Sequence, residues 1–306
     1  MTPRLPVSVI IPAHNSAEHL PAVLAACRSQ TLPPAEIIVV DDGSRDATSD
    51  ICRDCAPEAR LVRIENGGVA RARNIGARHA SGEAFVFLDA DDILLPHALE
   101  TLASRLAGTH AGVAYGMVID RREPPTPPRL SGFDFVAGEP PLPAERNFWR
   151  CGIITPGSAI VRADLHREVG GFVTGYEPLE DRDYWIKCGL LRSVAFCDTV
   201  VLDKTWRPSS HGSQHAKRIY RGQLAQRRLA AWCQSHGVPA DWIPQEREIL
   251  RRALNEACWR GCEEIIPALR REASSVGLFH WRSLPALISR PAEPDWLGDE
   301  PRVLES

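Results

Sequence analysis

The first 110 residues alternate short apolar runs with segments whose apolar residues recur at helical spacing. The apolar runs predict four strands, over Val7–Ile11, Glu36–Val40, Leu61–Glu65 and Ala84–Leu88. The amphipathic segments predict a helix after each strand, beginning near Leu20, Thr48, Val69 and Pro96. Because a parallel neighbour can be reached only by a covered return path, this alternation predicts a doubly wound α/β sheet.

The loop after the first predicted strand carries a helix-start signal. Asn15 is followed three residues later by Glu18, which is the spacing of a capping box. We therefore expect Asn15 to cap the first helix.

Beyond residue 110 the pattern is less regular. Val113–Ile119 predicts one more strand, whereas Glu123–Pro143 is rich in proline and lacks periodicity, so we expect a long surface loop there. The same half of the chain predicts a short strand at Ile160–Val161, a helix over Glu180–Leu191 and a strand over Val200–Trp206.

The last third of the chain has helical periodicity. From about Ser213 the pattern predicts helices interrupted at Pro239 and Pro267. The expected organisation is an α/β domain over residues 1–212, followed by a C-terminal helical extension and tail over residues 213–306.

Composition and charge narrow the functional class. The chain has 306 residues, of which 44% are hydrophobic and 25% charged, and its net charge of −3 argues against a dedicated nucleic-acid binder. No apolar run approaches the roughly 20 residues that a membrane span requires, and Met1–Pro6 does not resemble a signal peptide. The nine cysteines are odd in number and scattered, which favours a reducing, cytoplasmic location over a disulfide framework.

Polar residues follow several predicted strands, at the sheet edge where doubly wound proteins bind ligands. His14 and Asn15 follow the first strand, and Asp41 and Asp42 the second. The fourth strand is followed by Asp89, Asp91 and Asp92. The sequence thus predicts that three loops bring polar and acidic groups to one edge.

The two acidic loops each have two interpretations. Asp41–Ser44 is either an Asx turn before the next helix or a site where a carboxylate accepts hydrogen bonds from a base or ribose. Asp89 and Asp91 are either helix-capping acids before Pro96 or, if a turn aims both at one ion, ligands for Mg²⁺ or Mn²⁺ that also binds a diphosphate.

Four segments resemble, in order, the opening motifs of family-2 glycosyltransferases with the GT-A fold. They are Val7–Asn15, Val39–Ser44, Asn66–Val69 with Ala72–Gly76, and Phe87–Asp92. The resemblance covers roughly residues 7–212 and implies a doubly wound mixed sheet that binds a nucleotide-sugar donor.

The resemblance also implies roles for the strand-end residues. Asp42 corresponds to the acid that binds the nucleotide base, with Pro12, His14 and Asn15 at the same pocket. Asp89 and Asp91 match the family's DXD motif, in which the first acid lies near the ribose and the last binds the divalent metal. Arg73 lies in the ARN segment, where it either steadies the loop or contacts a phosphate; an ordinary surface salt bridge is the alternative.

Further motifs resemble the acceptor side of the family's site. Gly157 and Ser158 open one such segment, and Glu180 and Asp181 match the ED motif, whose aspartate is the base in inverting members. A carboxylate with a pKa near 4 is a weak base in water but is adequate when it is held against a hydroxyl in a dry cleft. The alternative is that both acids merely favour the start of a helix.

Several aromatic and basic residues remain open to two interpretations. His211, in a segment that resembles the closing loop, is either a further metal ligand or an ordinary exposed histidine, with His215 as the competing candidate. Trp185, like Trp149 and Trp206, either stacks on a sugar or packs in the core. Five basic residues without an acid among them form either a solvated helix face or a contact with anionic lipid or a lipid-diphosphate acceptor: Lys217, Arg218, Arg221, Arg227 and Arg228.

We therefore expect a metal-dependent, inverting glycosyltransferase that acts on a UDP-sugar. Its acceptor would be a hydroxyl group of a saccharide, of a lipid-linked molecule or of another compound. The enzyme would act in the assembly of cell-surface polysaccharide or glycoconjugate, in the cytoplasm at the inner face of the membrane. A nucleotidyltransferase is disfavoured because the loop Pro12–Asn15 has no glycine, lysine or arginine. A non-catalytic binding module is disfavoured because it would be expected to lack the acids at 89, 91 and 181, which are present here. A dehydrogenase is disfavoured because no GxGxxG follows the first predicted strand.

Overall fold

The computed structural model describes residues 5–122, 129–131, 154–206, 215–241 and 243–276. These residues divide into two compact units. The first contains the described residues up to Thr174 together with 180–206, and the second contains 175–179 and the described residues from 215 onward. The domain boundary expected at residue 212 lies outside the described residues, so it stays a prediction.

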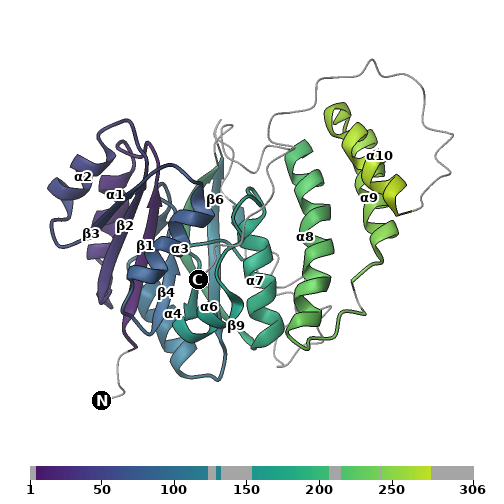
Figure 1. Cartoon of the computed structure of the whole chain (residues 1–306). Coiled ribbons are helices and arrows are strands. Elements are labelled where there is room, and N and C mark those ends of the chain that lie inside the picture. Colours follow the sequence, from purple (N-terminus) through teal and green to yellow (C-terminus); the bar gives the residue numbers. More distant parts are fainter. Residues whose placement is uncertain (1–4, 123–128, 132–153, 207–214, 242, 277–306) are drawn as a thin grey trace. The chain divides into compact units, whose positions relative to one another are not determined.

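The first unit is built on a mixed nine-stranded sheet (Figure 1). Its strands follow the order β3-β2-β1-β4-β8-β6-β9-β5, and β7 pairs with β6. The strands β1 to β4 are parallel to their neighbours in this group, whereas β8 is antiparallel to both β4 and β6. The bounds are β1 Val7–Ala13, β2 Glu36–Asp42, β3 Arg60–Ile64, β4 Ala84–Phe87, β5 Ile93–Leu94, β6 Val113–Arg122, β7 Arg129–Ser131, β8 Ala159–Arg162 and β9 Val194–Trp206. The predicted mixed α/β sheet is thus confirmed.

Helices cover both faces of this sheet. On one face, α1 and α4 pack their apolar residues against alternate strand residues such as Val9 and Val39. On the other face, α3 packs against Ile38 and Val40. Gly76 lets α3 approach closely, because a Cβ there would lie 2.3 Å from the side chain of Ile10. The bounds are α1 Leu20–Arg28, α2 Thr48–Cys55, α3 Val69–His79, α4 Ala98–Ala107, α6 Ala163–Val169 and α7 Glu180–Leu191.

A cluster of aromatic rings fixes α7 on the α3 side of the sheet. Phe172 stacks on Tyr184 with ring centroids 4.0 Å apart and meets Phe87 of β4 edge-on at 4.9 Å. His166 of α6 is buried among these rings, and its Nδ1 lies 2.8 Å from the hydroxyl of Tyr184. Burial lowers the pKa of His166 to about 4, so the imidazole is neutral at pH 7. This packing fixes where α7 begins, at Glu180.

The second unit is helical, as predicted. It contains α8 His215–Ser235, α9 Glu246–Trp259 and α10 Ile266–Ser275. Its core includes Leu250, Leu254 and Leu269. Pro267 lies in the first turn of α10, where its missing N–H has no intrahelical partner to lose. It therefore begins a helix and does not interrupt one.

The basic residues of α8 do not form a uniformly solvated face. Arg221 is 5% exposed, and its guanidinium lies 3.8 Å from the carboxylate of Glu177. Arg227 forms ion pairs with Glu246 and Glu272. The interpretation of the five residues as one solvated face is therefore wrong for these two, which bind acids that are distant in sequence. Among the described residues, no helix is both long and apolar enough to cross a membrane.

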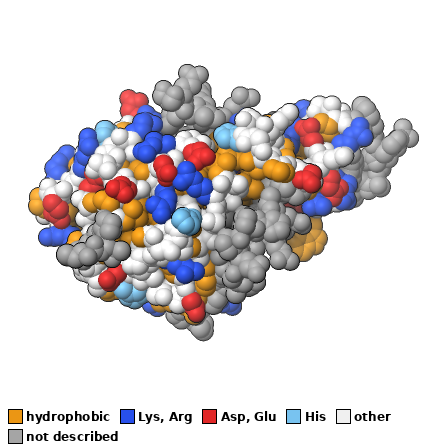
Figure 2. Space-filling view, turned by 90° about the horizontal axis from the view of Figure 1, so that it is seen from below, with side chains coloured by type: hydrophobic (Ala, Val, Ile, Leu, Met, Phe, Trp, Pro, Cys, Tyr) orange, Lys and Arg blue, Asp and Glu red, His pale blue; other side chains and the backbone are white. Residues whose placement is uncertain are grey.

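Charges of both signs lie on the surface. On the face shown in Figure 2, Lys and Arg side chains are interspersed with Asp and Glu side chains. Exposed ion pairs on such a surface contribute little to stability, because water screens them. The charges that define a candidate site are therefore the buried ones.

Three local predictions need correction, and two elements were not predicted. Within the described part of the chain no side chain caps α1, and Asn15 lies four residues before its N-cap, His19. The expected loop over Glu123–Pro143 contains the strand β7, and the remainder of that segment lies outside the described residues. The strand predicted to start at Val200 begins at Val194, and both β5 and α6 were not predicted.

Candidate functional site

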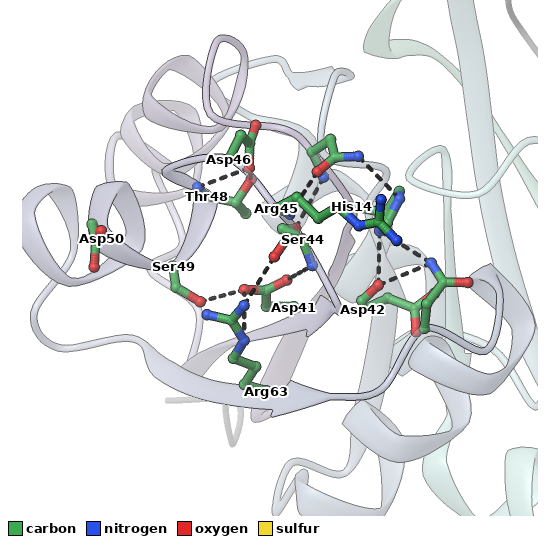
Figure 3. A network of polar contacts seen from close by, with 12 residues as sticks. His14, Asp41, Asp42, Ser44, Arg45, Asp46, Thr48, Ser49, Asp50 and Arg63 are labelled. Carbon is green, nitrogen blue, oxygen red and sulfur yellow. Dashed lines mark hydrogen bonds and ion pairs between the residues drawn. The ribbon is translucent and has the colours of Figure 1, made fainter.

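The carboxyl end of β2 holds the first acidic pair, as the last two residues of the strand and not in the following loop (Figure 3). Asp41 is fully buried; it accepts a 2.8 Å hydrogen bond from the Ser44 backbone N–H and another from the Ser49 hydroxyl. Burial by itself would raise the pKa of Asp41, but these hydrogen bonds outweigh it and lower the pKa. Asp41 thus stabilises the turn before α2, which is the structural alternative stated for this segment.

Asp42 is held by a different turn. Its two carboxylate oxygens accept hydrogen bonds from the backbone N–H groups of Gly67 and Gly68, at 2.8 and 2.9 Å. Its backbone carbonyl lies 2.7 Å from Nδ1 of His14 and accepts a 3.0 Å hydrogen bond from Asn66. Gly68 has a φ of 88° and precedes α3, so glycine suits this turn. The Asn-Gly-Gly segment therefore orients the second acid of the pair.

The loop after β1 lies beside this acid. His14 and Asn15 are both exposed, whereas Pro12 is buried within β1. Asn15 has a φ of 50°, and its side-chain oxygen accepts a 2.9 Å hydrogen bond from the Arg45 backbone. The side chain of Asn15 therefore connects two strand-end loops and does not cap a helix. The structure brings His14, Asn15 and Asp42 together, as the sequence predicted.

The carboxyl end of β4 holds the second acidic group. Asp89 accepts a 2.7 Å hydrogen bond from Arg73, and its other oxygen lies 3.6 Å from the ammonium of Lys204. Burial would raise the pKa of Asp89, but the Arg73 guanidinium and the Lys204 ammonium outweigh it and hold the pKa below its usual range. Asp92 is fully buried and accepts a 2.9 Å hydrogen bond from Lys204.

Arg73 connects the second acidic group to the start of α7. Its side chain is buried, and its second nitrogen donates a 2.9 Å hydrogen bond to Glu180. Its guanidinium carbon also lies 5.2 Å from the ring centroid of Phe172. The interpretation of Arg73 as part of a surface salt bridge is therefore wrong. Arg73 is buried and joins Asp89 to Glu180 inside the protein.

The neighbouring residue on α3 fixes a second segment. Asn74 accepts a 2.8 Å hydrogen bond from the backbone N–H of Phe172 and donates one of 2.8 Å to its carbonyl. Gly171, at a φ of 76°, must be a glycine here, because a Cβ would lie 2.6 Å from the Asn74 side-chain oxygen. Consecutive residues of α3 thus hold the turn at Phe172 and the acid at Glu180.

Asp181 lies at the start of α7, beside the acids and cations just described. Burial raises the pKa of Asp181, and this outweighs the lowering by Arg73 and by a 2.7 Å hydrogen bond from the Arg182 backbone. The negative charge of Asp89 raises the pKa further. A carboxylate with a raised pKa is a stronger base than one in water.

The predicted acceptor-side residues have mainly structural contacts. Gly157 has a φ of 83° and packs against Leu88 and Leu202, and the Ser158 hydroxyl donates a 2.7 Å hydrogen bond to the carbonyl of Thr155. Trp185 is fully buried and meets Tyr184 edge-on. Of the two interpretations given for Trp185, packing in the core is therefore the one that the structure supports.

Two of the predicted residues cannot be placed. His211 and Trp149 lie outside the described residues. The metal role of His211 therefore stays a prediction.

The turn after β4 is the candidate position for a divalent ion. In the described part of the chain, no group of three or more His, Cys, Asp or Glu side chains is placed to hold a metal ion. Mg²⁺ and similar ions are commonly bound through one or two carboxylates together with substrate phosphates. Asp91 is half-buried in a turn that is closed by a 3.2 Å hydrogen bond from the Asp92 N–H to the Asp89 carbonyl. A single carboxylate in this turn fits binding of an ion shared with substrate phosphates.

The site contains residues that sequence analysis missed. Lys204 lies in a predicted strand, but nothing in the local sequence marks its pairing with Asp92, which depends on strands 112 residues apart. Apart from the site, the description of the cysteines as scattered is wrong for Cys52 and Cys55, which form a C-x-x-C pair on α2; both thiols are free. Burial raises the pKa of the Cys52 thiol, so the thiol is protonated at pH 7.

Comparison with known proteins agrees with this arrangement. The family model described as glycosyl transferase family 2 matches residues 8–170, just over half of the chain. An uncharacterized glycosyltransferase of Rickettsia felis is 27% identical over 225 residues, which are 70% of this chain and 35% of that protein. The chain thus spans about a third of the length of that curated relative.

Two solved structures share the fold. TarS 1–349 of S. aureus, in complex with UDP-GlcNAc, gives a TM-score of 0.61 at 20% identity and covers 83% of this chain and 72% of its own. Mannosyltransferase PcManGT from Pyrobaculum calidifontis, in complex with GDP-Man and Mn²⁺, gives a TM-score of 0.54 at 20% identity. The match covers 90% of this chain and 81% of the mannosyltransferase chain. The predicted GT-A fold is thereby confirmed.

Proposed function

Because the chain belongs to glycosyl transferase family 2, we propose that it transfers a sugar from a UDP-sugar to a hydroxyl acceptor with inversion at the anomeric carbon. The observation that carries this proposal is the group of acids around Arg73. Asp89 follows β4 and Glu180 begins α7, and the two carboxylates lie 2.7 and 2.9 Å from one guanidinium. Asp181 follows Glu180 directly. This arrangement supports a donor-binding acid and a base within one site.

The proposed base is Asp181. Displacement of a nucleoside diphosphate in one step requires the acceptor hydroxyl to lose its proton as it attacks. A carboxylate whose pKa is raised by burial accepts that proton more readily than one in water. Arg73 sets the neighbouring Glu180 and thereby the position of the first turn of α7. The fixed position of this turn supports a base that is held against its substrate before reaction.

The proposed nucleotide site is the end of β2 and the loop after β1. Asp42 is oriented by Gly67 and Gly68, and His14 lies against the Asp42 carbonyl. In this proposal Asp89, held by Arg73, meets the ribose. The complexes of TarS with UDP-GlcNAc and of PcManGT with GDP-Man support a nucleotide-sugar donor on this fold.

Asp91 would hold a divalent ion, Mn²⁺ or Mg²⁺, together with the donor diphosphate. When bound, such an ion supplies a Lewis acid that neutralises the charge of the leaving group. The complex of PcManGT with Mn²⁺ supports this part of the proposal. His211 is proposed as a further ligand.

The acceptor is proposed to be a hydroxyl group of a saccharide, of a lipid-linked molecule or of another compound, in the assembly of a surface polysaccharide or glycoconjugate. A cytoplasmic enzyme at the inner face of the membrane would meet such acceptors.

The first experiment is a thermal-shift panel of UDP- and GDP-sugars with and without Mn²⁺. A ligand that binds only the folded protein raises its Tm. We expect a UDP-sugar to raise the Tm more in the presence of Mn²⁺ than in its absence. A panel in which no nucleotide sugar changes the Tm would contradict the proposed donor.

The second experiment replaces the proposed base. We expect Asp181→Asn to abolish release of the nucleoside diphosphate by transfer, while the donor Kd stays within about threefold, because the amide cannot accept the proton but fills the same space. Asp164→Asn is the matched control, since its carboxylate is exposed on α6 and pairs with Arg192. Nearly full turnover by Asp181→Asn would exclude this residue as the base.

A further inference from the structure

The strand register explains why a lysine enters the acidic group at the end of β4. The short strand β5 pairs antiparallel with β9, with Ile93 opposite Asp203 and Leu94 opposite Leu202. One step further along, this register sets Lys204 opposite Asp92. Successive side chains of a strand point to opposite faces, so Lys204 shares the face of the fully buried Leu202. Lys204 is therefore a cation on the core-facing side of β9.

Lys204 lies between two carboxylates. Its ammonium is 2.9 Å from one oxygen of Asp92 and 3.6 Å from one oxygen of Asp89. The other oxygen of Asp89 accepts the hydrogen bond from Arg73. Each oxygen of Asp89 thus faces a different protein cation, and only 18% of the Lys204 side chain is exposed. Burial would lower the pKa of Lys204, but the two aspartates outweigh it and raise the pKa, so the ammonium stays charged.

This geometry has a consequence for divalent ions. A hard cation needs carboxylate oxygens that face it, and the two protein cations face both oxygens of Asp89 and one of Asp92. A second cation placed among them would also be repelled at short range by the ammonium. The ion pairs with Lys204 and Arg73 therefore compete directly with a metal for the same carboxylates.

We propose that Lys204 is a positioning residue that keeps Asp89 and Asp92 as ion-pair partners, and that it thereby restricts divalent-cation binding at this turn to Asp91 and the donor diphosphate. This inference rests on the proposed function for the identity of the donor. It assigns Lys204 two effects: it fixes Asp89 for the donor, and it prevents the nucleotide-free site from collecting a metal ion.

The simplest competing role is that Lys204 only compensates the charge of buried Asp92. Replacing one partner of a buried ion pair leaves a charge uncompensated, whereas replacing both is far less costly. The double variant Lys204→Met with Asp92→Asn removes both charges. It therefore separates a role in holding Asp89 from a role in satisfying Asp92, and it guards against a single variant that does not fold.

The first test measures Mn²⁺ alone. The nucleotide-free protein is titrated with Mn²⁺, and the free ion is followed by electron paramagnetic resonance for the wild type, Lys204→Met and Arg121→Met. Arg121 is the control because it pairs with Asp203 on the opposite face of β9. We expect Lys204→Met to lower the Kd for Mn²⁺ by about tenfold or more, because two carboxylates lose their ammonium. An unchanged Kd would overturn the proposal.

The second test measures donor binding by calorimetry, with the UDP-sugar that the thermal-shift panel identifies. We expect both Lys204→Met and the double variant to raise the donor Kd by about tenfold, the size expected when one charged contact no longer positions Asp89. Recovery of the wild-type Kd in the double variant would show that Lys204 serves only Asp92, and it would overturn the positioning role.

The two tests fail separately from the proposed function. If the wild type binds none of the nucleotide sugars, the proposed donor is wrong, but the Mn²⁺ titration still compares Lys204→Met with Arg121→Met. If the wild type binds a UDP-sugar and Lys204→Met binds both the sugar and Mn²⁺ with unchanged Kd, the proposed function stands and the role of Lys204 is overturned.

Discussion

The carboxyl ends of β2 and β4 both carry closely spaced aspartates, but the groups that meet these acids differ in charge. At β2, uncharged backbone N–H groups and a serine hydroxyl donate hydrogen bonds to Asp41 and Asp42, and the exposed guanidinium of Arg63 lies 3.9 Å from Asp41. At β4, a guanidinium and an ammonium hold Asp89 and Asp92. Hydrogen bonds from uncharged groups therefore hold the first acidic group at the end of its strand, whereas two largely buried protein cations neutralise the second.

This difference follows from the elements beside each strand and not from the aspartates. The end of β2 lies beside two glycine-containing turns, one after β2 at Gly43 and one after β3 at Gly67 and Gly68, whose N–H groups point at the carboxylates. The end of β4 lies beside the middle of α3 and the end of β9, which supply Arg73 and Lys204. Similar acidic segments thus acquire different chemistry from neighbours that are far away in sequence.

Removing the cation at each end gives the largest expected contrast. Arg73→Met leaves Asp89 and Glu180 without their shared buried partner, and we expect it to lower the free energy of unfolding by about 3–5 kcal/mol. Arg63→Met removes a guanidinium that is 57% exposed and 3.9 Å from Asp41, and we expect a loss below about 1 kcal/mol. Urea denaturation of both variants measures the difference. Equal losses would mean that the two ends do not differ as described.

Replacing the acid at the neutral end gives a smaller effect. Asp42→Asn turns one acceptor into a donor that faces a backbone N–H, and we expect a loss of about 1–3 kcal/mol in the free energy of unfolding. Asp50→Asn is the matched control, because Asp50 is exposed on α2 and lies apart from the network in Figure 3. The comparison by urea denaturation fails if both variants lose the same amount.

The smallest effect is a pH dependence at the neutral end. The pKa of Asp41 is lowered in the folded protein, so its contribution to stability is present above the usual aspartate pKa of about 4 and is lost as the pH falls through the folded value. Asp41→Asn lacks this contribution. We expect the stability difference between wild type and variant to shrink as the pH falls from about 5 to about 3, measured by urea titrations. A difference that does not change with pH would contradict the assignment.

Much of the fold could be predicted because periodicity is a local property. The start of α2 and both bounds of α7 agree with the predicted helices, and the first four strands lie where the apolar runs placed them. The strand β5 has two residues, which is too short to produce any period. The polar segment of α6, with Asp164 and Arg167, has no long apolar stripe that would mark a helix.

The candidate site could be predicted in part. Asp42, Asp89 and Asp181 stand out because acids at strand ends and helix starts are visible in the sequence. The role of Arg73 as a buried connection between two motifs depends on tertiary distances, as does the pairing of Lys204 across β5 and β9. The packing of Trp185 depends on which side of α7 faces the sheet, and α7 has apolar and charged residues on all sides.

The two contacts made by neighbouring residues of α3 have a consequence for loop exchange. Asn74 grips the chain at Phe172, and Arg73 grips it at Glu180. Both ends of the stretch 173–179 are therefore anchored to the same turn of α3. Lengthening a stretch with two anchored ends has a small entropic cost, since each doubling of loop length adds only about 0.6 kcal/mol to the free energy of loop closure. An insertion in this stretch is therefore expected to leave the start of α7, and with it Asp181, in place.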